Sequence, residues 1–203
     1  MNLGEVKAQF LALLNNTRCT PTLVTGFIDA GLGRCQRELR CPAMEKSLQI
    51  TIGSDYDGLW IPGDYLAFIR LENSYGRKLV RKSLDYVKAR AAEGVGTPQF
   101  YARQNKQFII GPLPAEGDTL RLDYYAEFEA VSADTDENLL TLISPYLLIY
   151  SALCFASDYF TDVRAERFEG RYVQILGQLN QQTKDDEIID ASVQPEFGFL
   201  EDW

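Results

Sequence analysis

The sequence contains no histidine. Without an imidazole, neither a Ser-His-Asp nor a Cys-His catalytic arrangement can be built from these 203 residues. The four cysteines (Cys19, Cys35, Cys41 and Cys154) show no CxxC spacing, which disfavours a zinc site and predicts reduced thiols. GxGxxG, P-loop and EF-hand spacings are also absent. The sequence therefore nominates no catalytic residue, no metal site and no cofactor.

Long hydrophobic runs are missing as well. The longest, LLIYSALCFA at 147–156, is about half of the ~20 residues that a membrane-spanning helix needs. The first ten residues, MNLGEVKAQF, carry an acid and an amide where a signal peptide would be basic and then apolar. We therefore expect a soluble, intracellular chain.

Acidic residues are abundant, at 29 against 20 lysines and arginines. A glycosidase-like pair of carboxylates is thus compatible with the composition, but no spacing selects one. Asp55 and Asp57 beside Trp60 come nearest, and their surroundings are those of turn residues. A carboxylate-based hydrolase stays open as an alternative.

Charge is distributed unevenly along the chain. Residues 1–126 have a balance of +3 and residues 127–203 a balance of −12, which together give the net −9. Such polarity favours electrostatic complementarity with a partner or between copies. The basic stretch 77–90 can contact an acidic surface, touch phosphates, or form a solvated face. Its predicted inter-subunit residues are Arg77, Lys78, Arg81 and Lys82.

Helical periodicity dominates the N-terminal part. Asn2 and Glu5 have the spacing of a capping box ahead of an apolar stripe, which predicts a first helix. Thr20-Pro21 predicts the start of a second helix that runs to about Arg40. The glycines within it lower helix propensity and indicate close packing against a neighbour: Gly26, Gly31 and Gly33.

The middle of the chain changes to a period of two. A hairpin strand is predicted at 77–80 after the Asn73–Gly76 turn, and Ser83 predicts a helix through Glu93. A short strand is expected ahead of Pro62. Further strands are predicted at 47–53, 66–72, 100–104, 106–111 and 119–128.

Two more helices are predicted after the strands. Ser144-Pro145 indicates the start of one, and a turn at 160–162 makes the next its antiparallel neighbour. We therefore predict an α+β fold with an antiparallel β-rich insertion and an extended C-terminal arm. The expected parts are a helical bundle of residues 1–45 and 138–184, a β-rich insertion with one helix at 46–137, and the arm at 185–203.

The arm ends in QPEFGFLEDW at 194–203, which combines large apolar side chains with acids. Pro195 and Gly198 disfavour a helix, and an extended arm can add to a partner's sheet edge or groove. A tail folded back on its own subunit is the alternative. The apolar anchors of the arm are Ile188, Ile189, Val193, Phe197, Phe199, Leu200 and Trp203.

A series of motifs runs through residues 96–176. Gly96-Thr97-Pro98 precedes an aromatic strand at Tyr101, Pro112-Leu113-Pro114 ends the next strand, and Tyr124-Tyr125 closes a third before two helices. This order resembles the head-to-tail adaptor (head-completion, or connector) proteins of tailed bacteriophages. The resemblance covers roughly residues 3–182.

The resemblance implies a structural virion protein at the head-tail junction, synthesised in the host bacterial cytoplasm and without enzymatic activity. It further implies a ring, often dodecameric, whose C-terminal arm reaches the portal protein and whose far side meets a tail or nozzle protein. Double-stranded DNA would pass through the lumen without sequence-specific binding. The alternatives from the residues are a virion-associated carboxylate-based cell-wall hydrolase and a small nucleic-acid-binding protein that uses residues 77–90.

Overall fold

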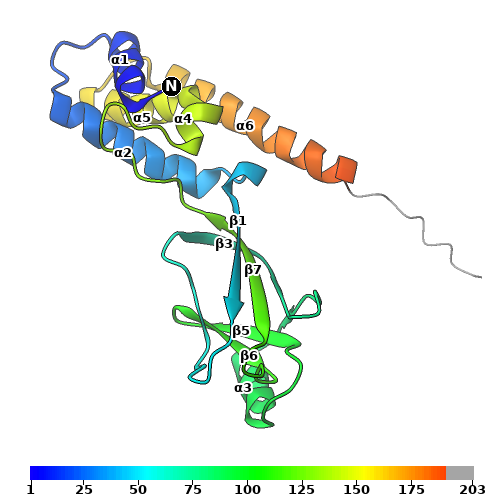
Figure 1. Cartoon of the computed structure of the whole chain (residues 1–203). Coiled ribbons are helices and arrows are strands. Elements are labelled where there is room, and N and C mark those ends of the chain that lie inside the picture. Colours follow the sequence, from blue (N-terminus) through cyan, green and yellow to red (C-terminus); the bar gives the residue numbers. More distant parts are fainter. Residues whose placement is uncertain (191–203) are drawn as a thin grey trace, which may run out of the picture. The chain divides into compact units, whose positions relative to one another are not determined.

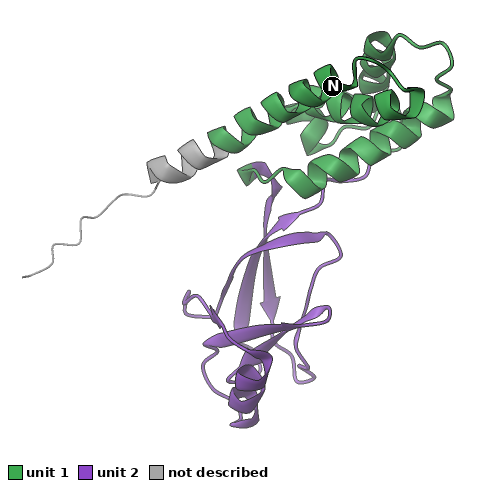
Figure 2. Cartoon of the chain, turned by 180° about the vertical axis from the view of Figure 1, so that it is seen from behind, with its two compact units in different colours: residues 1–42, 132–203 green, residues 43–131 purple. Residues whose placement is uncertain are grey.

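A computed structural model describes residues 1–190, with side chains up to residue 182. The chain divides into two compact units (Figure 2). One unit comprises residues 1–42 and the segment from residue 132 onward, and the other comprises residues 43–131. The described part of the first unit has helices as its regular structure, whereas the second unit contains seven strands and a helix (Figure 1). The predicted α+β class is confirmed.

Helix α1 (Leu3–Leu14) begins at the predicted capping box. The Asn2 side chain accepts a hydrogen bond from the Glu5 backbone N–H at 2.8 Å, and the Glu5 carboxylate accepts one from the Asn2 N–H at 3.2 Å. These bonds satisfy backbone donors that a helix start leaves unpaired. The helix ends where Asn15 adopts a left-handed conformation, and one face is buried: Leu3, Val6, Phe10 and Leu14.

Helix α2 (Pro21–Glu38) begins at the predicted Thr20 cap. The predicted close packing is confirmed at Gly31, where an added Cβ would lie 2.8 Å from the backbone nitrogen of Ala152. It is not found at Gly26, where an added Cβ would meet nothing within 4 Å, and Gly33 approaches only the flexible end of Arg37. Only one of the three glycines therefore marks a helix contact.

Three helices follow residue 138. The short α4 (Leu139–Ile143), which was not predicted, has its own capping box between Asn138 and Thr141. Helix α5 (Pro145–Phe160) begins at the predicted Ser144-Pro145. A left-handed Thr161 leads into α6 (Ala165–Asp190), which packs against α5 (Figure 1).

The predicted end of the last helix is wrong. Helix α6 continues to Asp190, so residues 185–190 are helical where we predicted an extended arm. The prediction rested on the loss of an apolar stripe at Asp185. Extending a helix that has already formed requires no such stripe, because each further residue adds a hydrogen bond to an existing nucleus.

The β-rich unit contains two sheets. The first is antiparallel, with the order β1 (Glu45–Thr51), β7 (Thr119–Ala126), β3 (Tyr65–Glu72). The second has the order β2 (Leu59–Trp60), β6 (Gln107–Gly111), β5 (Phe100–Gln104), β4 (Val80–Arg81). Helix α3 (Leu84–Ala92) packs on β5 and β6. The core of this unit is formed by alternate strand residues, among them Leu71, Phe108, Ile110, Leu122 and Tyr124.

The hairpin predicted at 77–80 is present but short. Residues 77–79 pair antiparallel with the end of β3 through the Glu72–Lys78 bridge and through hydrogen bonds from Asn73 N–H to the Arg77 carbonyl and from Leu79 N–H to the Leu71 carbonyl, at 3.0 and 2.8 Å. Strand β4, which follows at Val80–Arg81, pairs in parallel with β5, so the second sheet is mixed. No helix within the described residues is long and apolar enough to cross a membrane.

Candidate interaction surfaces

The predicted basic residues lie along the β4 edge of the second sheet. We call Arg77, Lys78, Arg81 and Lys82 the basic edge; all four are exposed. None of them forms a salt bridge with another described residue, whereas the neighbouring Arg90 pairs with Glu93 at 2.9 Å. The basic edge thus presents four positive charges that the described part of the subunit does not neutralise through ion pairs.

The turn before the basic edge is held by Asn73, which is 6% exposed. Its side-chain oxygen accepts hydrogen bonds from the backbone N–H groups of Tyr75 and Arg77 at 3.0 and 3.1 Å, and its amide donates to the Pro98 carbonyl at 2.9 Å. Leu79, which is 2% exposed, anchors the strand in the core. The charged side chains therefore project from a fixed backbone, which suits them to a contact with carboxylates or phosphates.

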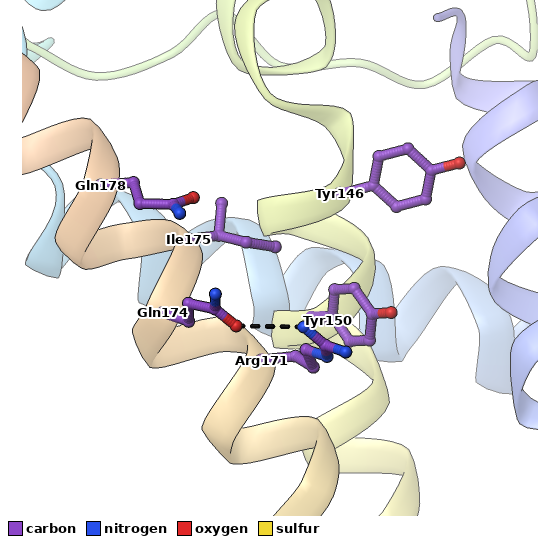
Figure 3. A pocket seen from close by; sticks show the side chains of 6 residues that line it. All are labelled: Tyr146, Tyr150, Arg171, Gln174, Ile175 and Gln178. Atoms are coloured by element: carbon purple, nitrogen blue, oxygen red, sulfur yellow. Dashed lines mark hydrogen bonds between the residues drawn. The ribbon is translucent and has the colours of Figure 1, made fainter.

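A second surface lies in a groove between α5 and α6 (Figure 3). We call this the α5–α6 groove; its volume is about 410 Å³. Arg171 donates a hydrogen bond to Gln174 at 3.1 Å along the α6 side of the groove. Tyrosine and arginine are enriched among the residues that dominate protein–protein binding energy. The lining residues are Tyr146, Tyr150, Arg171, Gln174, Ile175 and Gln178.

Exposed apolar side chains also precede the groove-lining part of α5 along the chain. Tyr146 is 47% exposed, and α4 just before it exposes Leu142 and Ile143 by 58% and 47%. Exposed apolar groups gathered around a concave surface are typical of a binding site. Sequence reasoning missed this groove, although Arg171, Ile175 and Gln178 recur at helical spacing beside the core stripe of α6.

Helix α6 is fastened to α2 by a polar cluster next to the groove. Arg34 donates two hydrogen bonds to Glu169, at 2.7 and 2.8 Å, and one to Glu38 at 3.1 Å. Its guanidinium lies 4.0 Å from the ring centre of Tyr172, whose hydroxyl donates to Glu38 at 2.8 Å. The paired Arg34 holds the pKa of Glu169 below its ordinary value. Burial raises the pKa of the adjacent Cys35 thiol to about 12, so this thiol is protonated at neutral pH.

The outer face of the first sheet carries another polar network. The carboxylate of Asp123 accepts hydrogen bonds from Ser47 at 2.6 Å and from Arg121 at 3.0 Å, and also pairs with Arg70. Burial alone would raise the pKa of Asp123, but these three donors outweigh it and leave the pKa lowered. Both carboxylate oxygens have donors, so the buried negative charge of Asp123 is compensated within the network. The same hydrogen bonds connect the three strands of the sheet.

The structure does not describe the side chains of the predicted arm residues. Ile188 and Ile189 lie within the helical range of α6, and Val193, Phe197, Phe199, Leu200 and Trp203 lie outside the described residues. Of the two aspartates interpreted as turn residues, Asp55 lies in a turn, and Asp57 lies in the irregular segment after it. Within residues 1–182 no three His, Cys, Asp or Glu side chains gather as a metal site would require.

Comparison with known proteins gives one clear relationship. The family model described as SU10 adaptor protein matches residues 1–194, which is nearly the whole chain. None of the curated proteins matches the chain. The match spans both the helical unit and the β-rich unit, so a single family model covers both.

Proposed function

The chain belongs to the SU10 adaptor protein family of phage head-to-tail adaptors, and from this premise we propose that it assembles as a ring that docks on the portal and connects the DNA-filled capsid to the tail. The observation that carries the proposal is the family match over residues 1–194. Membership in itself means a general adaptor role at the head-tail junction of the virion.

The ring is built by a head-to-tail contact between copies. Such a contact joins two different surfaces, and repetition of the same rotation closes a ring. The resemblance to phage head-to-tail adaptors implies twelve copies in that ring. The basic edge supplies one of these surfaces, because its four positive charges have no ion-pair partner among the described residues. The acidic excess of residues 127–203 supplies the charge that it meets on the next copy.

The segment after α6 supplies the portal contact. Residues 191–203 combine Phe197, Phe199, Leu200 and Trp203 with acids, and large aromatic side chains are efficient anchors in a partner's groove. Ile188 and Ile189 belong to the helical stem that leads to it. A tail or nozzle protein binds the opposite side of the ring, and double-stranded DNA passes through the lumen without sequence-specific contacts.

The protein acts through its interfaces and catalyses no reaction. A structural adaptor family points to a non-enzymatic role, and the sequence has no histidine. The purified protein should neither clear a bacterial cell-wall suspension nor hydrolyse nucleotides. Either activity, if abolished by a single carboxylate-to-amide substitution, would support the hydrolase alternative instead.

Portal binding by matched variants tests the proposal. Purified portal rings should retain the full-length protein in a pull-down, and deletion of residues 191–203 should abolish retention while the helical circular dichroism signal stays. Trp203→Ala should weaken binding, whereas Trp60→Ala is the control, because Trp60 is 61% exposed in the β-rich unit. Normal binding by the deletion variant would remove the arm from the portal contact.

The basic edge is tested by charge reversal of its four residues. Ring formation on the portal should weaken, and added salt should weaken wild-type assembly in the same direction, because salt screens exposed charges over about 10 Å at 0.1 M. Unchanged assembly by the quadruple variant would show that the contact between copies lies elsewhere.

A further inference from the structure

The α5–α6 groove has the chemistry of a peptide-binding site and no occupant among the described side chains. Tyr146 and Tyr150 offer aromatic surface from α5, and Ile175 projects from α6 toward α5 (Figure 3). Arg171 lies at one end and donates one hydrogen bond, to Gln174, so most of its five N–H donors have no partner among the described residues. In an extended segment, aromatic side chains would pack on the apolar side chains of the groove, and a carboxylate would accept hydrogen bonds from the Arg171 guanidinium.

The chain itself contains such a segment outside the described residues. Within residues 197–203, Phe197, Phe199, Leu200 and Trp203 are apolar, and Glu201 and Asp202 are acidic. In an extended chain Phe197, Phe199 and Glu201 point to the same side. We propose that residues 197–203 dock in the α5–α6 groove of their own subunit as long as the portal is absent.

The length of the connection fits this placement. Helix α6 extends twelve residues from Gln178 to Asp190, a rise of about 18 Å at 1.5 Å per residue. Residues 191–196 span about 20 Å when extended, enough for the chain to return along α6 to the level of Gln178. The groove from Gln178 to Arg171 is about 10 Å long on α6. Phe197 to Glu201 spans about 13 Å, which sets Glu201 beside Arg171. Trp203 then lies about 7 Å beyond Arg171, over the preceding turn of α6, where docking of the segment shields it from water.

Attachment to the same chain favours the docked form. A short tether gives an effective concentration of about 1 mM. If the separate peptide bound the groove with a Kd of about 100 µM, the attached segment would be docked roughly nine-tenths of the time. Weak affinity therefore suffices for the free subunit, and a tighter portal site can still displace the segment.

The fluorescence of Trp203 tests the docking in the free, full-length protein. The chain has two tryptophans, so Trp60→Phe leaves Trp203 as the sole reporter. Acrylamide should quench Trp203 severalfold less in this protein than in a synthetic peptide of residues 191–203. Tyr146→Ala and Arg171→Glu should each raise quenching toward the peptide value. The controls Tyr75→Ala and Arg37→Glu, which make the same changes at exposed positions outside the groove, should leave it unchanged.

Three other results would contradict docking within one subunit. Quenching equal to that of the peptide would show that Trp203 stays in water. Protection that survives both groove substitutions would place the segment on another surface. Protection that appears only as the protein concentration rises would assign the groove to the segment of a second copy, because docking within one chain does not depend on concentration.

One consequence rests on the proposed function. If the portal and the groove compete for residues 197–203, Tyr146→Ala and Arg171→Glu should bind portal rings faster than the parent protein, since the segment is released. Slower binding would make the groove itself a portal contact and would contradict the competition. Protected Trp203 in a protein that the portal ignores would refute the portal proposal and leave the docking intact.

Discussion

Gly31→Ala should destabilise the helical unit, although alanine is the better helix former. An added Cβ at Gly31 would lie 2.8, 3.1 and 3.3 Å from the backbone nitrogen, Cα and Cβ of Ala152. Two of these are backbone atoms, so α2 and α5 must move apart to make room. The Ser151 hydroxyl also donates a hydrogen bond to the Gly31 carbonyl at 3.1 Å. Moving the two helices apart would stretch or break this hydrogen bond.

The expected change in the free energy of unfolding combines two costs and one gain. Overpacking costs about 1–3 kcal/mol, the strained hydrogen bond about 1 kcal/mol, and higher helix propensity returns up to ~1 kcal/mol. The expected net loss is about 1–3 kcal/mol, or roughly 2–4 °C in Tm per kcal/mol for a chain of this size. Gly26→Ala is the matched control in the same helix, because an added Cβ there meets nothing within 4 Å; it should be neutral or stabilising by up to ~1 kcal/mol.

Urea unfolding followed by circular dichroism at 222 nm measures both variants. The two substitutions are chemically identical, but only Gly31→Ala should lower the urea midpoint. If Gly31→Ala were as stable as Gly26→Ala, the close approach of α2 to Ala152 would be wrong.

Two further predictions concern the ion pairs of the helical unit. Arg34→Gln should cost about 1–2 kcal/mol in urea unfolding, since Glu169 and Glu38 lose their donor and Tyr172 its cation–π contact, whereas Arg37→Gln on the same helix should stay within ~0.5 kcal/mol. Hydrogen bonds from Arg164 lower the pKa of Asp162 from 3.8 to about 2. Because the folded pKa lies below the unfolded one, this carboxylate stabilises the fold fully above pH ~4 and loses its effect as the pH falls toward about 2. Asp162→Asn should remove that part of the acid sensitivity, and an unchanged pH profile of stability would contradict it.

The helix starts were predictable because their signals are local. The Asn2–Glu5 box, Thr20-Pro21 and Ser144-Pro145 each satisfy backbone donors or set φ within a few residues, and each helix begins where predicted. The helix ends were harder to predict from the sequence, because α6 continues to Asp190 without an apolar stripe.

Pairing and surfaces depend on contacts that lie far apart in sequence. Residues 77–79 form the short hairpin that the turn predicts, yet β4 directly after them pairs in parallel with β5, and no local residue encodes that choice. The same holds for Gly31, which looks like Gly26 and Gly33 in sequence but alone meets a neighbouring backbone. The basic edge was predicted as a cluster of charges, but its lack of ion-pair partners among the described residues emerges only from the fold.

Imaging the protein together with the portal shows whether it forms a ring there. Cryo-electron microscopy of purified portal incubated with the full-length protein should show an added ring of twelve copies coaxial with the portal. Residues 191–203 should extend into portal density. A portal that stays bare, or density at isolated positions without rotational symmetry, would contradict the account.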